Sequence, residues 1–205
     1  MPHQHLQPVG AGRQQSVDNH HTHLFEGPVN YGESVTLTAT VKPSFGGTPT
    51  GTVTFLHGST VLGSVTPSGG VAKLTLSNFS VGTTHVEATY GGSSEFLTST
   101  SSQEAQIVNK ASTTTTLTSS KDPSTHGSSV TFTANVHAAS GATPTGSVTY
   151  KDGSTTLGSG TVNGSGKATF STIALASGTH SITAIYVGSS DDATSTSSTL
   201  SQKVD

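Results

Sequence analysis

The chain has 205 residues and a formal net charge of −3, and Asp, Glu, Lys and Arg together make up only 9% of it. Because a domain usually has about 100 to 200 residues, this length allows one large domain or two small ones. Ser and Thr contribute 70 residues and Gly another 24. All three are poor helix formers and Thr favours strands, so the composition disfavours a helical protein.

The same composition excludes several classes of function. The 8 basic residues are spread singly along the chain, so no cationic stripe exists that could neutralise phosphates, and we expect no nucleic-acid partner. The apolar runs are a few residues long, far short of the ~20 that a membrane-spanning helix needs, so we expect no membrane insertion. The chain contains no Cys, which excludes disulfides, thiol catalysis and cysteine-based zinc sites.

Residues 1–27 differ from the rest of the chain in being rich in His. This leader has no apolar core of the kind that a secretory signal requires. We therefore expect either a cytoplasmic protein or a piece of a larger exported one. Where the second half of the chain has a run of Thr, the leader has Asp18-Asn-His-His-Thr-His-Leu-Phe25, so a first strand of this part would be atypical, disordered or replaced.

The remainder of the sequence contains an internal repeat. Tyr31-Gly-Glu-Ser-Val-Thr-Leu-Thr-Ala-Thr-Val41 matches His126-Gly-Ser-Ser-Val-Thr-Phe-Thr-Ala-Asn-Val136 at an offset of 95. Thr48-Pro-Thr-Gly-Thr-Val-Thr-Phe55 matches Thr143-Pro-Thr-Gly-Ser-Val-Thr-Tyr150 at the same offset. One inserted residue in the second copy then makes the offset 96, so that Tyr90 matches Tyr186. Two copies of one domain account for most of the chain, and we place them at 28–109 and 110–205.

Within each copy, apolar residues alternate with Thr or Ser, as expected of half-buried strands. Gly-rich segments separate about seven such strands per copy, which is typical of an antiparallel sandwich. The residues expected to point inward are Val35, Leu37, Ala39, Val41, Val53, Phe55, Ala72, Leu74, Leu76, Val86, Ala88 and Tyr90 in the first copy, and Val130, Phe132, Ala134, Val136, Val148, Tyr150, Ala168, Phe170, Ile182, Ala184, Tyr186, Leu200 and Val204 in the second.

The last strand of the first copy departs from this pattern. Glu104 places a charge where the second copy has Leu200. We therefore expect a shifted register, with Ala105 and Ile107 as the core residues of that strand.

The order of motifs in the second copy closely resembles the bacterial Ig-like domain repeats. The motifs are Ala111-Ser-Thr-Thr-Thr-Thr-Leu117, Asp122-Pro-Ser124, His126 to Val136, Thr143 to Tyr150, Gly166-Lys-Ala-Thr-Phe170 and Ser177-Gly-Thr-His-Ser-Ile-Thr-Ala-Ile-Tyr186. The resemblance covers about residues 28–204. It implies an all-β chain of two tandem immunoglobulin-like sandwiches, located extracellularly or at a cell surface. Partners implied by it are neighbouring Ig-like repeats and a protein or glycan surface, and the family supplies no catalytic residues.

Histidine clustering in the leader raises the question of a metal site. His3, His5, His20, His21 and His23 are half of all ten His, and on a strand His21 and His23 would share one face. Neutral imidazoles bind zinc, copper or nickel. The competing interpretation, which we favour, is a solvated terminal segment, because only Asp18 and Glu26 lie nearby as further ligands.

Two other places could carry chemistry. Asp191 and Asp192 beside Ser189 and Ser190 offer oxygens for calcium, but Asp and Ser also favour plain turns, and we expect a turn. His85 and His180 could serve as bases for a Ser, yet no nucleophile elbow or nucleotide-binding loop is present. We therefore expect no catalytic residue, no metal site and no cofactor.

The four Tyr residues, Tyr31, Tyr90, Tyr150 and Tyr186, are expected in the core or at corners. For Tyr90 and Tyr186 we expect a buried ring whose hydroxyl is tied to the backbone.

Three hypotheses about function remain open at this point. The leading one is a non-catalytic spacer or adhesion module of an exported bacterial surface or secreted protein. The second is a carbohydrate-binding accessory module of a secreted hydrolase, although the absence of Trp weakens a sugar-stacking platform. The third is a small hydrolase or metal-dependent enzyme that uses an unrecognised Ser/His or His/Asp site.

Overall fold

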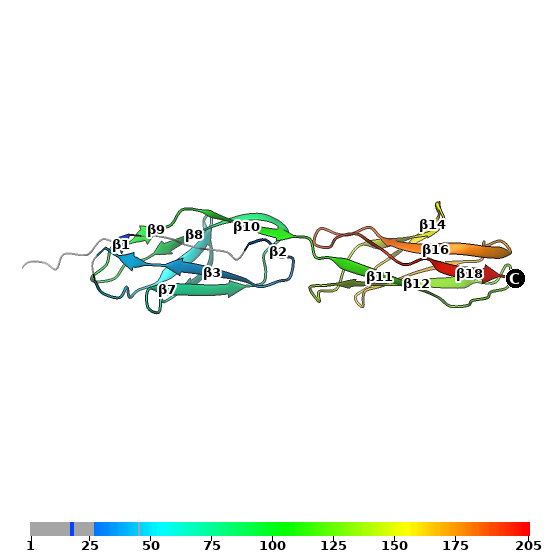
Figure 1. Ribbon diagram of the computed structural model, residues 1–205, viewed down its shortest axis with the longest axis horizontal. Coiled ribbons are helices and arrows are strands. Elements are labelled where there is room, and N and C mark those ends of the chain that lie inside the picture. The colour runs from blue at the N-terminus through cyan, green and yellow to red at the C-terminus, as the bar shows by residue number, and fades with distance from the viewer. Residues whose placement is uncertain (1–16, 19–26, 45) are drawn as a thin grey trace, which may run out of the picture. The chain divides into compact units, whose positions relative to one another are not determined.

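A computed structural model describes residues 17–18, 27–44 and 46–205, and its regular secondary structure consists of strands (Figure 1). In this described part of the chain no helix is present that could cross a membrane. The chain divides into two compact units. One contains 34–77 and 83–107, and the other contains 28–33, 78–82 and 108–205.

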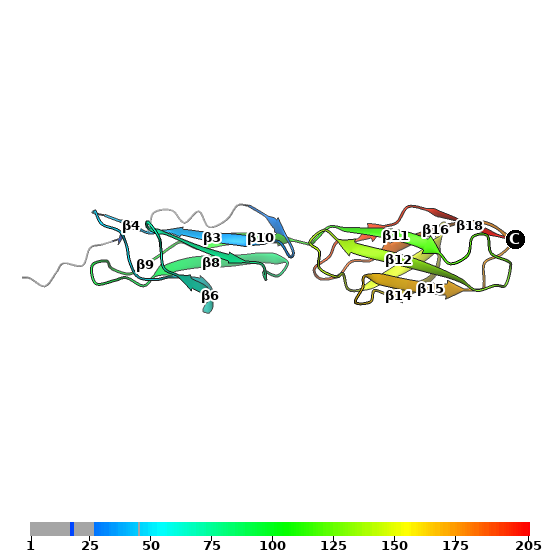
Figure 2. The same ribbon diagram turned by 90° about the horizontal axis from the view of Figure 1, so that it is seen from below.

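The C-terminal copy is a sandwich of two sheets (Figure 2). The first sheet has the order β11-β12-β15, and the second has the order β14-β13-β16-β17 with β18 also paired to β16. The strands are β11 (Thr113–Ser119), β12 (Val130–Ala138), β13 (Ser147–Asp152), β14 (Thr155–Thr161), β15 (Lys167–Thr172), β16 (Gly178–Tyr186), β17 (Ser195–Thr196) and β18 (Leu200–Val204).

In the N-terminal copy, the strands from β3 to β10 correspond to β12 to β18, whereas before β3 the described residues include no strand as long as β11. β3 pairs with β7, and a larger sheet has the order β2-β10-β8-β5-β6 with β9 also paired to β8. A short pair of β1 with β4 stands apart from these sheets. The strands are β1 (Val17–Asp18), β2 (Val29–Asn30), β3 (Val35–Thr40), β4 (Lys42–Pro43), β5 (Val53–His57), β6 (Thr60–Val65), β7 (Val71–Leu76), β8 (Gly82–Tyr90), β9 (Ser99–Thr100) and β10 (Glu104–Asn109).

Details of strand pairing repeat between the copies. The register of β5 with β6 shifts between Phe55 and Leu56, and the register of β13 with β14 shifts between Tyr150 and Lys151. These two irregularities lie 95 residues apart, at matched positions of the repeat. The repeat therefore specifies backbone geometry as well as the pattern of apolar residues.

The alternation predicted from the sequence is the one observed. Along β3 and β12, every second residue is buried, from Val35 to Ala39 and from Val130 to Ala138. Most of the expected inward residues are buried, whereas Leu74, Leu76, Phe170 and Leu200 are half-buried. In the second copy, Phe170 stacks on the ring of Tyr150 with centroids 5.6 Å apart. Outward Thr pairs such as Thr36 with Thr75 contact each other across the strands at 3.0 Å.

The prediction of a shifted register in the last strand of the first copy is wrong. In β10, Gln106 and Val108 are buried, while Ala105 and Ile107 are exposed. The matching residues of β18, Gln202 and Val204, are buried in the same way. Because the buried residue at this position is a Gln, a prediction that counts only apolar residues misses the alternation of this strand.

Candidate functional site

The leader histidines His3, His5, His20, His21 and His23 lie outside the described residues, so the structure does not bear on their expected role. Among the residues that are described, no group of three or more His, Asp or Glu side chains is placed to hold a metal ion. A metal site therefore has no support from the two sandwiches themselves.

The Asp191–Asp192 turn uses its polar groups internally. Asp192 is buried, and its Oδ2 accepts hydrogen bonds from the Ser189 hydroxyl at 2.8 Å and from the Tyr186 hydroxyl at 3.4 Å. The backbone N–H of Asp192 donates to Ser189 Oγ at 3.0 Å. The carbonyl of Asp191 accepts the N–H of Ala111 at 2.8 Å. Oxygens that a calcium ion would need are already used to fix the turn and the strand entry beside it.

His180 lies on β16 and is held by two partners. Its Nδ1 is 2.6 Å from Asp152 Oδ2 on β13, and its Nε2 is 2.8 Å from the carbonyl of Ala176. The other carboxylate oxygen of Asp152 accepts the N–H of Ser181 at 3.0 Å. The carbonyl of Ala176, followed by the hydrogen bond to Asp152, raises the pKa of His180 above its ordinary value. This geometry favours an imidazolium that donates from both nitrogens, which leaves no lone pair for proton abstraction.

His85 does not repeat this arrangement. The residue that matches His180 at the offset of 96 is Thr84, and the residue that matches Asp152 at the offset of 95 is His57. Instead, Nδ1 of His57 lies 2.8 Å from the carbonyl of His85. The two histidines singled out by the sequence therefore occupy unmatched positions, and the structure brings neither into a nucleophile–base–acid array.

The prediction for Tyr90 and Tyr186 is confirmed. Both rings are buried, and the hydroxyl of Tyr90 donates to the carbonyl of Thr50. The hydroxyl of Tyr186 donates to the carbonyl of Thr145 at 2.5 Å. Tyr150 is also tied, because its hydroxyl donates to the Ala168 carbonyl at 2.7 Å and lies 3.3 Å from the N–H of Ala134. Burial raises the pKa of both Tyr150 and Tyr186.

Sequence reasoning missed the two buried glutamines. Gln202 Nε2 donates to the carbonyls of Lys121 at 2.7 Å and Lys203 at 3.0 Å, and its Oε1 accepts the Ser119 hydroxyl at 2.6 Å. Gln106 Nε2 donates to the carbonyls of Gly27 and Ile107. Its Oε1 is buried without a partner among the described residues. Gln106 and Gln202 match each other at the repeat offset of 96, and this match is the sequence signal that could have identified them.

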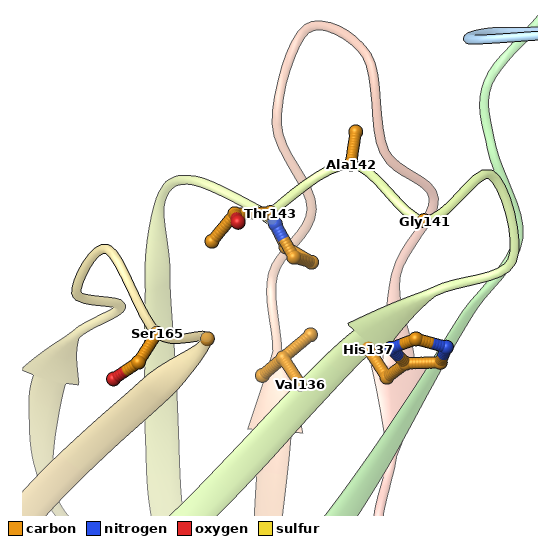
Figure 3. Close-up of a pocket in the computed structure, with 8 residues that line it drawn as sticks. Val136, His137, Gly141, Ala142, Thr143 and Ser165 are labelled. Atoms are coloured by element: carbon orange, nitrogen blue, oxygen red, sulfur yellow. The ribbon is translucent and has the colours of Figure 1, made fainter.

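A surface hollow of about 140 Å³ lies at one end of the C-terminal sandwich (Figure 3). It is formed by the end of β12, the loop that follows it and the turn before β15, and its lining residues are Val136, His137, Gly141, Ala142, Thr143, Pro144, Ser165 and Gly166. The side chains are short, and none of these residues is a Phe, Tyr or Trp that could stack on a sugar ring. The hollow thus offers space for a few water molecules rather than a built ligand site.

With its fold and sites described, the chain can be placed among known proteins. It belongs to the bacterial Ig-like domain (group 3) family, which it matches over residues 24–109 and 117–205. The comparison with curated proteins found no match.

Solved structures with a similar fold include modules of bacterial proteins, two of them adhesins. The fibronectin(III)-like modules of Clostridium thermocellum CbhA are 21% identical, with 92% of each chain covered and a TM-score of 0.37. The Escherichia coli adhesin FdeC is 19% identical, with 97% of this chain and 66% of that chain covered and a TM-score of 0.39. A 1.5-MDa bacterial ice-binding adhesin is 16% identical, with 95% and 66% covered and a TM-score of 0.38.

The chain thus spans just under two thirds of the two adhesin structures. With identities of 21% or less and TM-scores below 0.5, these likenesses do not bear on function.

Proposed function

We propose that the chain is a non-catalytic spacer module of a bacterial surface or exported protein, with adhesion as the second role open to it. The observation that supports this proposal is that, among the residues the structure describes, several polar side chains that could do chemistry are held by partners inside the fold. Both nitrogens of His180, the carboxylate of Asp192 and the hydroxyl of Tyr186 have internal partners. Membership of the bacterial Ig-like family supports the same conclusion.

The surface chemistry also fits a spacer. Outward positions of the strands are occupied by Thr and Ser, whose hydroxyls pair across strands, as with Thr131 and Ser171 at 2.8 Å. Such a surface is hydrated and carries little charge. It separates two neighbouring domains without creating a strong field that would attract a charged partner.

The test presents the full chain on a bacterial surface, between a membrane anchor and a small reporter domain. A matched control replaces it with a Gly/Ser linker of the same number of residues. We expect the reporter to stand at a narrower range of heights above the folded chain, because folded domains hold their length whereas a Gly/Ser coil of this length fluctuates widely about its mean span. Fluorescence energy transfer from the membrane to the reporter measures this range. An equally broad range of heights in the two cases would contradict the spacer role.

A second assay addresses the other two hypotheses directly. The purified chain is incubated with a panel of chromogenic esters, with and without EDTA, and is separately passed over insoluble polysaccharides. We expect no turnover and no retention. Turnover that disappears in His85→Ala plus His180→Ala, or that EDTA abolishes, would establish an enzyme. Retention on one polysaccharide would instead establish a carbohydrate-binding accessory module.

A further inference from the structure

In each copy, parallel pairing joins the segment that precedes β3 or β12 to the last strand of that copy. In the N-terminal copy, β2 pairs in parallel with β10, with Val29 opposite Val108 and Asn30 opposite Asn109. The N–H of Tyr31 adds a hydrogen bond to the Asn109 carbonyl at 2.8 Å. Because β10 is the last strand of this copy, the pair connects a segment near the N-terminal side of the sandwich with the segment where the chain leaves it.

The C-terminal copy has the same connection at the matched residues. Ser124 forms a parallel bridge with Val204. The N–H of Ser124 donates to the Lys203 carbonyl at 2.9 Å, the N–H of Asp205 donates to the Ser124 carbonyl at 2.8 Å, and the N–H of His126 donates to the Asp205 carbonyl at 2.8 Å. Both Ser124 and Val204 are buried, so the bridge itself is shielded from water, whereas His126 and Asp205 at its end are exposed.

A second parallel bridge in this copy joins Ala111 to Asp192. The N–H of Ala111 donates to the Asp191 carbonyl, and the Ala111 carbonyl accepts the N–H of Ala193, both at 2.8 Å. Ala111 is fully buried. The segment that leads into β11 is thereby fixed to the loop before β17. This loop lies in the last part of the chain, shortly before β18.

Tension on the two ends of a chain loads a pair of parallel strands in shear. Two parallel strands pulled at opposite ends slide along each other, so all hydrogen bonds between them share the load and must break together. Strands that are pulled at adjacent ends, such as the two strands of an antiparallel hairpin, peel apart and lose their hydrogen bonds one at a time. Forced unfolding depends on the unfolding rate, and a barrier that requires several bonds to break together lowers this rate steeply under load.

We infer that each Ig-like domain of this chain is a force-bearing element, in which the parallel pairs β2–β10 and Ser124–Val204 act as shear clamps. The inference rests on the spacer role proposed above and specifies it as a spacer under tension. Tension reaches every covalently linked domain whatever the orientation between domains. The clamps therefore keep the domains folded in a protein whose two ends are attached to objects that are pulled apart.

A buried side chain reinforces the C-terminal clamp. Gln202 Nε2 donates a hydrogen bond to the carbonyl of Lys121 and lies 3.4 Å from the Ser124 hydroxyl. These contacts connect β18 to the segment that precedes the bridge. Asp122 Oδ1 accepts the N–H of Lys203 at 2.9 Å. In the N-terminal copy, Gln106 makes fewer hydrogen bonds to the described residues.

The absence of native Cys makes a directional test simple, because engineered thiols are unique attachment points. In the full chain, Ser112→Cys with Asp205→Cys loads the C-terminal domain in shear, from the start of β11 to the end of β18. Ser129→Cys with Asp205→Cys pulls apart adjacent ends of the clamped strands and peels them. Single-molecule force spectroscopy at one loading rate should give an unfolding force at least about two-fold higher in the shear geometry.

A backbone variant removes one clamp bond without disturbing the fold. His126 is the second residue of a four-residue turn in which Ser128 N–H donates to the Thr125 carbonyl and Gly127 has φ +79°. Pro suits this position of a type II turn and lacks the N–H that bonds Asp205. His126→Pro should therefore lower the shear force, while the chemical denaturation midpoint should fall only by the small amount expected for the loss of one hydrogen bond at the end of the chain. His126→Ala keeps the N–H and is the matched control.

The possible outcomes separate the two proposals. Equal unfolding forces in the two geometries, or a shear force in His126→Pro equal to that of His126→Ala, would overturn the clamp. Turnover or polysaccharide retention in the assays above would overturn the spacer role and would leave the force measurements unaffected.

Discussion

At the scale of single residues, the buried glutamines show how one side chain can serve differently in two copies of a fold. The amide oxygen of Gln202 accepts the Ser119 hydroxyl. The amide oxygen of Gln106 is buried and unpaired among the described residues. A buried polar group without a partner costs about 1 to 3 kcal/mol.

We expect Gln202→Leu to destabilise the chain by about 2 to 4 kcal/mol, because it removes three hydrogen bonds of a buried amide, with the Lys121 carbonyl, the Lys203 carbonyl and the Ser119 hydroxyl, each worth about 0.5 to 1.5 kcal/mol. The matched variant Gln106→Leu should cost clearly less, since among the described residues its amide makes two hydrogen bonds and its oxygen has no partner. Urea unfolding followed by circular dichroism gives both values. Equal losses of stability in the two variants would show that the internal hydrogen bonds of Gln202 are not what distinguishes the copies.

The His180–Asp152 pair predicts a dependence of stability on pH. The side chain of His180 is 14% exposed, and its pKa is raised by the Ala176 carbonyl and by Asp152. A raised folded-state pKa means that the folded protein binds the proton more tightly than the unfolded chain does. The stabilisation is therefore complete below the unfolded value of about 6.5 and is lost as pH rises through the folded value.

Other charged groups near this pair are few. Lys151 precedes Asp152 on β13, and Lys203 on β18 lies opposite Thr179, next to His180 in the sequence. Lys203 is paired with Asp205 through a short contact.

We expect His180→Gln to lower the free energy of unfolding more at pH 5.5 than at pH 8.5, as measured by urea titrations at both pH values. His137→Gln, at an exposed position of β12, is the control and should show no such difference. A loss that is the same at both pH values would mean that His180 is not charged in the fold.

At the scale of elements, close approach of the two sheets constrains glycines in the C-terminal copy. A Cβ on Gly160 of β14 would lie 2.4 Å from the backbone oxygen of Thr169 on β15. A Cβ on Gly63 of β6 would meet only the end of the Leu74 side chain, at 2.7 Å. A backbone atom cannot move aside without shifting a strand, whereas a leucine can change rotamer.

Gly160→Ala should therefore destabilise its domain by about 1 to 3 kcal/mol, the usual cost of overpacking, and Gly63→Ala by clearly less. Urea denaturation gives both values. The residue matching Gly160 in the other copy is the half-buried Val65. If Gly160→Ala were as stable as the unaltered chain, the two sheets would have to shift at this point at no cost, and the close approach would not constrain the residue.

Much of the element pattern could be predicted from the sequence, because alternation of apolar residues reports burial directly. Strands such as β3 and β12 were predicted with the correct inward face. The last strand of the first copy was not, since its buried residue is the polar Gln106. Hydrogen bonds between distant residues, such as His180 with Asp152, depend on strand register and twist. No local pattern encodes these features, so the internal use of the candidate site residues became visible only in the structure.

At the scale of the whole molecule, each unit has a core of its own. In the C-terminal copy, Phe132 and Tyr150 belong to one cluster of buried residues that spans both sheets of that sandwich. In the N-terminal copy, the matching residues Leu37 and Phe55 are buried in the same way. A domain of this size, with its own apolar core, can unfold as one cooperative step.

This independence predicts two transitions in chemical unfolding, which core substitutions should move separately. Phe132→Ala removes a fully buried ring and should destabilise the C-terminal domain by about 3 to 5 kcal/mol. Leu37→Ala at the matched position should destabilise the N-terminal domain by about 2 to 5 kcal/mol. Native-state hydrogen exchange can assign each loss, because amides of β12 and β3 report on different domains.

We expect Phe132→Ala to accelerate exchange throughout β11 to β18 while the amides of β3 and β7 keep their protection, and Leu37→Ala to show the converse. If either substitution weakened protection in both copies to the same extent, the two sandwiches would form a single cooperative unit. The repeat would then be a feature of the sequence only, and the two copies would not unfold independently. Under tension such a chain would yield all at once, whereas two independent domains yield one after the other and extend the molecule in two steps while the second domain still holds.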